Sequence, residues 1–154
     1  MHLSIISKVV DRFYESNFED YSLYPNNKVD FKYSDQIVSE ILNDIDPKAY
    51  SLYKNLKKTG NIVIKDQEKM GYCINGLGID LDYISMDKKN DKMVTFIWCL
   101  VHELGHTYEN NYMSNMSSVQ QIFRYYYIFA EVLSTFFARV GLDYMIKNRI
   151  YLDD

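Results

Sequence analysis

The chain of 154 residues is poor in several features that mark whole classes of protein. It has two cysteines, Cys73 and Cys99, which are too few for a disulfide framework. Its longest apolar run, MVTFIWCLV, is nine residues long, far short of the ~20 that a membrane-spanning helix needs. The first twenty residues carry acids instead of the basic and then apolar segments of a secretory signal. We therefore expect a cytoplasmic protein with free thiols and no membrane partner.

An excess of basic charge is also missing. The chain has 17 Lys and Arg against 21 Asp and Glu, and a formal net charge of −4. The lysines near residues 54–58 and 88–92 are interspersed with acids and polar residues, so no basic face is expected for a phosphate backbone. Nucleic acid is therefore not an expected partner.

Residues that interrupt helices and strands are few, with two prolines and six glycines. A chain of this length and apolar content fits one domain, and we expect a single domain over residues 1–154. Tyrosine is abundant instead, at 15 residues. A tyrosine combines a large apolar body with a hydroxyl that needs a partner, which suits a cleft lined with hydrogen-bonding groups.

Apolar periodicity predicts a mainly helical chain with a small β element, an α+β fold. Helices are expected over residues 3–14, 34–45, 47–59, 92–110 and 118–147. Ser34 is expected to cap the second helix, while Asp46 and Pro47 begin the third and Gly60 ends it. Residues 61–65 and 78–85 read as short strands, the second with one buried and one open face, and residues 71–78 between them as a turn or irregular strand.

The segment VHELGH, residues 101–106, carries the clearest chemical motif. His102 and His106 are one helical turn apart, so both imidazoles can reach one metal ion. Glu103 is one step round the helix, where it can take a proton from a water that attacks a substrate. The competing interpretation is a chance motif in a buried helix, which explains neither the glutamate nor the spacing of the two histidines.

A third ligand has to come from elsewhere in the chain. His102, His106 and Glu109 would span about 10 Å along one helix, too far for a single ion. Metzincins place a glycine and a third histidine after the motif, and this chain has Glu109 and Tyr112 there.

Glu131 is the stronger candidate because it stands among apolar and aromatic residues, where an unpaired carboxylate is costly. An ion pair with Arg124 or Arg139 at an open position is the alternative. A short loop after the motif helix would bring the Glu131 helix back antiparallel beside it. Two histidines, a glutamate and one open position make a catalytic zinc site, so one Zn²⁺ per chain is expected.

The motif HELGH, followed after twenty-five residues by the glutamate of AEVLSTF, resembles the thimet oligopeptidase and oligoendopeptidase F family. The resemblance covers roughly residues 30–140 and includes the upstream stretch that ends in GYC. It implies a zincin-like metallopeptidase core that hydrolyses peptide bonds of oligopeptides. His102, His106 and Glu131 would bind zinc, Glu103 would be the general base, and Gly71, Tyr72 and Cys73 would border the cleft for an extended peptide substrate.

The chain departs from this family in three places. Glu109 stands where members commonly have a further histidine, the alanine of their GAYC turn is absent, and members are several times longer. Their later segment supplies a tyrosine and histidine group that stabilises the oxyanion, and a second polypeptide could complete the site here. Tyr127, four residues before Glu131, and Tyr144 are candidates to substitute for it, although an ordinary core or surface tyrosine is the favoured interpretation of either position.

Two other functions stay open. Small ImmA/IrrE-type peptidases, which cleave repressors, share the HELGH helix and a later E-x-x-A-x-x-F-A helix, and such an enzyme would cut one folded partner and ignore short peptides. A truncated, non-catalytic zinc-binding module would keep the metal only for folding.

Overall fold

The computed structural model describes residues 29–67, 70–74, 82–89, 92–113 and 127–150, with the backbone alone for residues 113 and 127–130. Within these residues the chain is mostly helical with one small sheet, which confirms the predicted α+β class. The helix predicted over residues 3–14 lies outside the described residues. None of the described helices combines the length and the apolar character that a membrane crossing requires.

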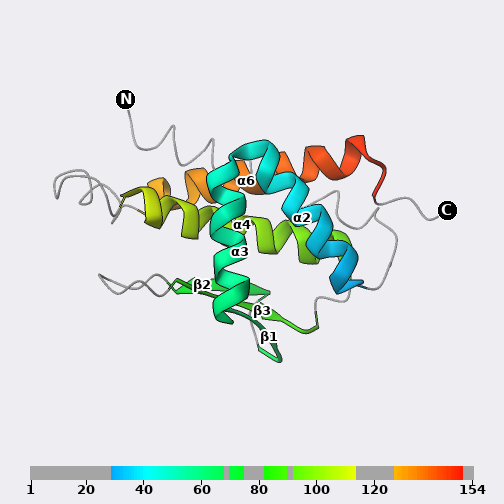
Figure 1. The fold of residues 1–154 in the computed structure, drawn as a ribbon, viewed down its shortest axis with the longest axis horizontal. Coiled ribbons are helices and arrows are strands. Elements are labelled where there is room, and N and C mark those ends of the chain that lie inside the picture. The colour runs from blue at the N-terminus through cyan, green and yellow to red at the C-terminus, as the bar shows by residue number, and fades with distance from the viewer. Residues whose placement is uncertain (1–28, 68–69, 75–81, 90–91, 114–126, 151–154) are drawn as a thin grey trace.

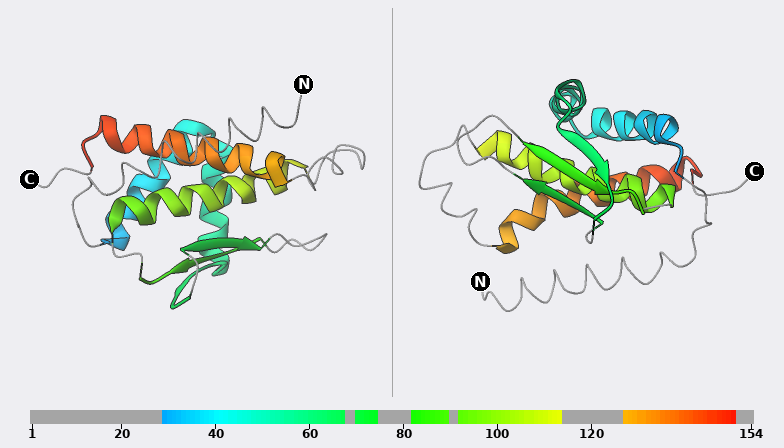
Figure 2. Two further views of the ribbon diagram at one scale, coloured as in Figure 1. Left: turned by 180° about the vertical axis from the view of Figure 1, so that it is seen from behind. Right: turned by 90° about the horizontal axis from the view of Figure 1, so that it is seen from below.

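Helix α4 (Met93–Met113) is the centre of the structure. It lies between helix α6 (Tyr127–Lys147) and the sheet, as Figures 1 and 2 show. Helices α2 (Phe31–Ile45) and α3 (Pro47–Thr59) follow one another directly and pack together. Both contact α4, and α2 also contacts α6. The apolar run at the start of α4 is therefore covered on several sides, and Ile97, Leu100 and Val101 are buried.

The sheet has the strand order β1-β3-β2. Strand β1 (Ile62–Lys65) pairs parallel with β3 (Tyr83–Asp87), and β2 (Gly71–Ile74) pairs antiparallel with β3. Residues 71–74, predicted as a turn or irregular strand, thus form a regular strand with Gly71 opposite Met86. Among the described residues β3 is the only strand that pairs with β2, which leaves β2 at an edge.

The prediction of one open face on the last strand was wrong. Ile84, placed on the open face, is fully buried, and Ser85 and Asp87 are also buried. Helix α4 covers one side of β3, while Gln67 covers the other by accepting a hydrogen bond from Ser85 Oγ at 2.6 Å. Residues 75–81, which include the first half of the predicted strand 78–85, lie outside the described residues.

The start of α2 also differs from the prediction. Asp30, not Ser34, is the N-cap, because its carboxylate accepts hydrogen bonds from the backbone N–H groups of Lys32 and Tyr33 at 2.9 and 3.0 Å. Ser34 is one turn inside the helix and buried. The predicted cap of α3 by Asp46 and its end at Gly60, which has φ of 75°, are confirmed.

The ends of the two long helices need a further correction. Helix α4 continues to Met113, three residues beyond the predicted end at residue 110. Helix α6 is described from Tyr127 onward. The earlier part of the predicted helix, residues 118–126, lies outside the described residues.

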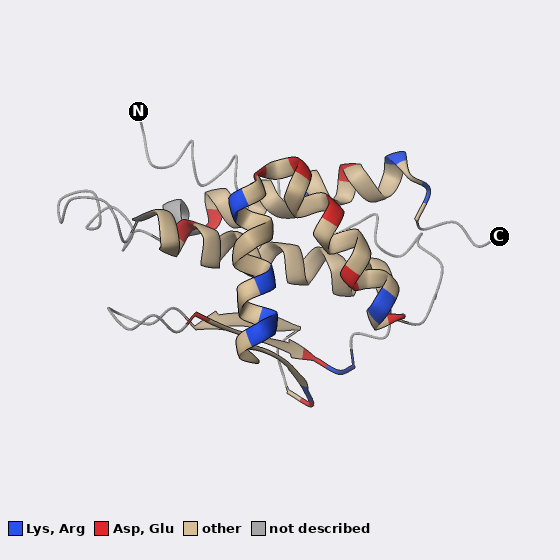
Figure 3. Cartoon of the chain, in the orientation of Figure 1, with Lys and Arg blue, Asp and Glu red and all other residues tan. Residues whose placement is uncertain are grey.

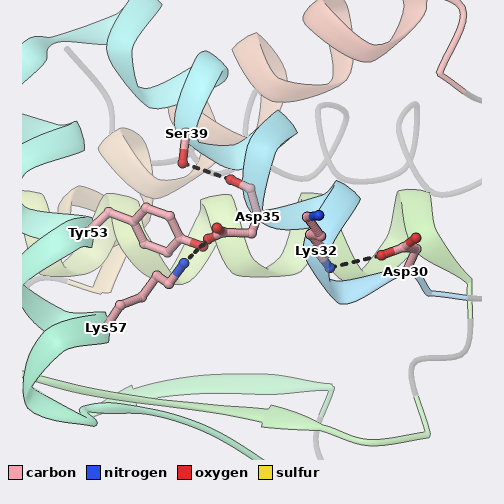
Figure 4. A network of polar contacts seen from close by, with 6 residues as sticks. All are labelled: Asp30, Lys32, Asp35, Ser39, Tyr53 and Lys57. Atoms are coloured by element: carbon pink, nitrogen blue, oxygen red, sulfur yellow. Dashed lines mark hydrogen bonds and ion pairs between the residues drawn. The ribbon is translucent and has the colours of Figure 1, made fainter.

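Tyrosine hydroxyls connect the helices to carboxylates. Tyr53 of α3 donates to Asp35 of α2 at 2.6 Å, and Lys57 pairs with the same carboxylate (Figure 4). The charged residues of α3 are all lysines, drawn in blue in Figure 3. The contact between Lys57 and Asp35 therefore places a positive charge of α3 beside a negative charge of α2. Tyr108 of α4 likewise donates to Asp46. Some of the abundant tyrosines therefore fix helix packing and do not line a cleft.

Candidate metal centre

Helix α4 presents His102 and His106 on one face, as their spacing predicts. The centroids of the two imidazole rings are 4.9 Å apart, with the rings nearly perpendicular. Both side chains are half-buried, with relative exposures of 14% and 17%. Two nitrogen donors therefore converge on one point beside α6.

The close approach of α6 to α4 depends on two glycines, Gly105 of α4 and Gly141 of α6. A Cβ atom added at Gly105 would lie 2.5 Å from Ser134 Cα, which is closer than any real contact allows. One turn earlier on α4, Val101 lies against Gly141 of α6. Because 105 meets 134 and 101 meets 141, the helices run antiparallel, and the predicted return that brings Glu131 level with the histidines is confirmed.

Glu131 places one oxygen between the two histidines. Its Oε2 lies 3.3 Å from His102 Nε2 and 3.5 Å from His106 Nε2. Two donors bound tetrahedrally to Zn²⁺ at the usual 2.0–2.1 Å are about 3.3 Å apart. All three donor atoms lie within 4.8 Å of one another, so His102, His106 and Glu131 could hold a metal ion, and the donor set fits zinc.

The electrostatics of Glu131 favour its ionised form. Burial alone would raise the pKa of this carboxyl, but hydrogen bonding and charge from His102 and His106, with help from Ser134, outweigh burial and hold its pKa below the ordinary value. Of the two arginines named in the alternative ion pair, Arg139 pairs with Asp143 at 3.2 Å. Arg124 lies outside the described residues.

Glu103 is buried beside His102, His106 and Glu131 but is not one of these three candidate ligands. Its side chain is on the sheet side of α4, where the backbone N–H of Cys73 donates to its carboxylate. Burial is the main cause that raises the pKa of Glu103 to about 7, and the charge of Glu131 adds to it, while His102 and the Cys73 N–H act in the opposite direction. A carboxylate with this pKa can accept and return a proton near neutral pH.

Strand β2 brings two of its three predicted site residues to Glu103. A Cβ at Gly71 would lie 2.9 Å from Cys99 Sγ and 3.3 Å from Glu103 Cγ, so glycine allows the strand to approach α4. The thiol of Cys73 contacts Thr107 Oγ1 at 3.2 Å. The Tyr72 side chain points to the opposite face of the strand and bonds Ser85, since neighbouring strand residues alternate. Its ring is therefore not brought to the site.

The structure describes the side chain of only one of the two tyrosines considered for the oxyanion, Tyr144. Tyr127 is the first residue of α6, and its side chain lies outside what the structure describes. Tyr144 donates its hydroxyl to Glu40 of α2. Because it stands thirteen positions after Glu131 on the same helix, it lies about 20 Å away along α6, and the suggestion that it serves the site was wrong.

Sequence reasoning missed two neighbours of the ligands. Trp98 stacks on the His102 ring, with centroids 5.7 Å apart and planes 23° apart. Ser134 donates to the Glu131 carboxylate at 3.1 Å. Both could have been found from helical spacing, because Trp98 is four residues before its ligand and Ser134 three residues after its own.

No protein-family model, curated protein or solved structure matches this chain. The resemblance to the oligopeptidases therefore stays a prediction, and the function is argued from the geometry of the site.

Proposed function

We propose that the protein is a zinc-dependent metallopeptidase with a zincin-like core that hydrolyses peptide bonds of oligopeptides. One observation carries this proposal: the Nε2 atoms of His102 and His106 lie 3.3 and 3.5 Å from a single oxygen of Glu131, beside the separate buried carboxylate of Glu103. A purely structural metal site is usually closed by four protein ligands. Three ligands and a nearby proton acceptor fit a hydrolytic site.

His102, His106 and Glu131 would hold the ion through one nitrogen or oxygen each. Zinc bound in such a site polarises a carbonyl and lowers the pKa of water toward 7. The chain supplies the proton transfers through Glu103. Its carboxylate would accept a proton from the attacking water and return it to the leaving amine.

The backbone around Glu103 positions this carboxylate. The Cys73 N–H donates to it, which restricts its rotation and keeps it close to the ligands. The edge strand β2 runs directly past it, because Gly71 has no side chain to hold the strand off. An extended peptide that lies along residues 71–73 would have its backbone next to Glu103.

Stabilisation of the oxyanion is the remaining requirement of peptide hydrolysis. Loss of one oxyanion donor typically costs about 10²–10³ in rate in enzymes that catalyse acyl transfer. Tyr127, one turn before Glu131 on α6, is our candidate for this donor.

The test is digestion of a mixed peptide library by zinc-loaded protein, followed by mass spectrometry and metal analysis. We expect the wild type to cleave, to lose activity with a chelator and to regain it with Zn²⁺. Glu103→Gln is expected to keep one zinc per chain and lose cleavage. Glu109→Gln, on the same helix and outside the ligand group, is the matched control and is expected to cleave. A wild type that holds zinc and cuts no peptide would instead indicate a non-catalytic module.

A further inference from the structure

Ser134 is a polar residue at the most crowded point between α4 and α6. It is fully buried, and its hydroxyl lies 3.1 Å from Glu131 Oε2 and 3.0 Å from the Glu131 carbonyl oxygen. The carboxylate oxygen that it contacts is the same Oε2 that lies 3.3 and 3.5 Å from the two histidine nitrogens. The hydroxyl therefore touches the proposed ligand atom itself.

Helical serines often bond a carbonyl of the preceding turn without any further role. Ser39 and Ser51 do so here, with their hydroxyls 2.7 and 2.9 Å from the carbonyl oxygens four residues earlier. Ser134 differs from both because a side-chain carboxylate is within reach of the same hydroxyl. Helix chemistry alone does not require that second contact.

A glutamate ligand has several rotatable bonds, and each must be fixed before its oxygen can meet a metal. Donors around a ligand reduce this freedom, and their loss typically weakens metal affinity by about 10- to 100-fold. Ser134 is suited to this task since its own position is fixed: Gly105 packs directly on its backbone.

We propose that Ser134 is a positioning residue, whose hydroxyl holds the Glu131 carboxylate in the orientation that binds the metal. This inference rests on the metal site of the proposed function and not on peptide cleavage. It assigns two tasks to one residue, because the small side chain permits the helix crossing and the hydroxyl orients the ligand.

The substitution Ser134→Ala separates these two tasks. Alanine keeps the backbone and Cβ that pack against Gly105, and it removes only the oxygen. Ser39→Ala is the matched control, because it removes a helical serine hydroxyl that bonds a carbonyl and touches no metal ligand. Urea unfolding of the metal-free proteins shows whether each variant folds.

The experiment measures Zn²⁺ affinity by competition with a chromophoric chelator. We expect Ser134→Ala to bind zinc about 10- to 100-fold more weakly than the wild type, and Ser39→Ala to bind like the wild type. In a Glu131→Ala background, Ser134→Ala should cause no further loss, because its effect passes through the missing carboxylate.

Equal affinity of Ser134→Ala and the wild type would overturn the proposal, as would an equal loss in the Glu131→Ala background. A wild type that binds zinc but cleaves no peptide contradicts the peptidase and leaves the Ser134 comparison intact. A wild type that binds no zinc overturns both.

Discussion

The buried carboxylate of Glu103 gives a prediction for the metal-free protein that does not depend on catalysis. Burial raises its pKa from 4.5 to about 7 in the folded chain. Below pH 4.5 the residue is protonated in both the folded and the unfolded state, so it costs no stability. Between pH 4.5 and 7 the unfolded chain ionises this carboxyl while the folded protein keeps it neutral, so stability falls as the pH rises and levels off above pH 7.

The size of this cost follows from the two pKa values. A pKa raised from 4.5 to about 7 corresponds to about 3 kcal/mol in the free energy of unfolding, at about 1.4 kcal/mol for each tenfold change in proton affinity. Glutamine keeps the shape and an oxygen that can accept the Cys73 N–H, and it carries no charge. We therefore expect Glu103→Gln to stabilise the metal-free protein by about 3 kcal/mol at pH 8 and by much less at pH 5.

Urea unfolding at both pH values, with a chelator present, measures this difference. Glu40→Gln serves as a control of opposite sign, because hydrogen bonds from Tyr144 and Gln36 hold the pKa of Glu40 below its ordinary value. Its neutralisation is expected to reduce stability at pH 8. A Glu103→Gln variant with the same stability change at pH 5 and pH 8 would refute the reasoning, since no ionisation would then be relieved.

Three further outcomes are expected. Gly105→Ala should lower the free energy of unfolding by about 1–3 kcal/mol in urea, because its Cβ would lie 2.5 Å from the α6 backbone, whereas Gly141→Ala, with 3.4 Å of room, should be neutral or slightly stabilising. Trp98 is the single tryptophan and stacks on a proposed ligand, so Co²⁺ should quench its fluorescence at one equivalent; unchanged emission with bound metal would contradict the stacking. Tyr127→Phe should reduce kcat by about 10²–10³ with zinc content unchanged, and full turnover would remove Tyr127 from the mechanism.

The proposed ligands could be found from the sequence because each depends on local chemistry. Helical spacing alone puts His102 and His106 on one face. Glu131 was found through the cost of a carboxylate among aromatic residues, and a short connection predicted its antiparallel return. No tertiary information was needed for these inferences.

Features that depend on contacts between distant segments could not be predicted. Ser34 and Asp30 are equally good cap residues, and only the backbone decides between them. The sequence alternation placed Ile84 on the open face of the strand, yet it is fully buried because α4 covers that face. The contact between Gly105 and Ser134, which sets the depth of the helix crossing, joins residues that have no special pattern in the sequence.

The central claim is that His102, His106 and Glu131 bind one zinc ion. X-ray absorption at the zinc edge of the stoichiometrically loaded protein tests it most directly, because it identifies the atoms bound to the metal. We expect nitrogen and oxygen ligands at about 2.0–2.2 Å, with two imidazoles and no sulfur. A sulfur shell near 2.3 Å, which only the Cys73 or Cys99 thiol could readily supply, would contradict it.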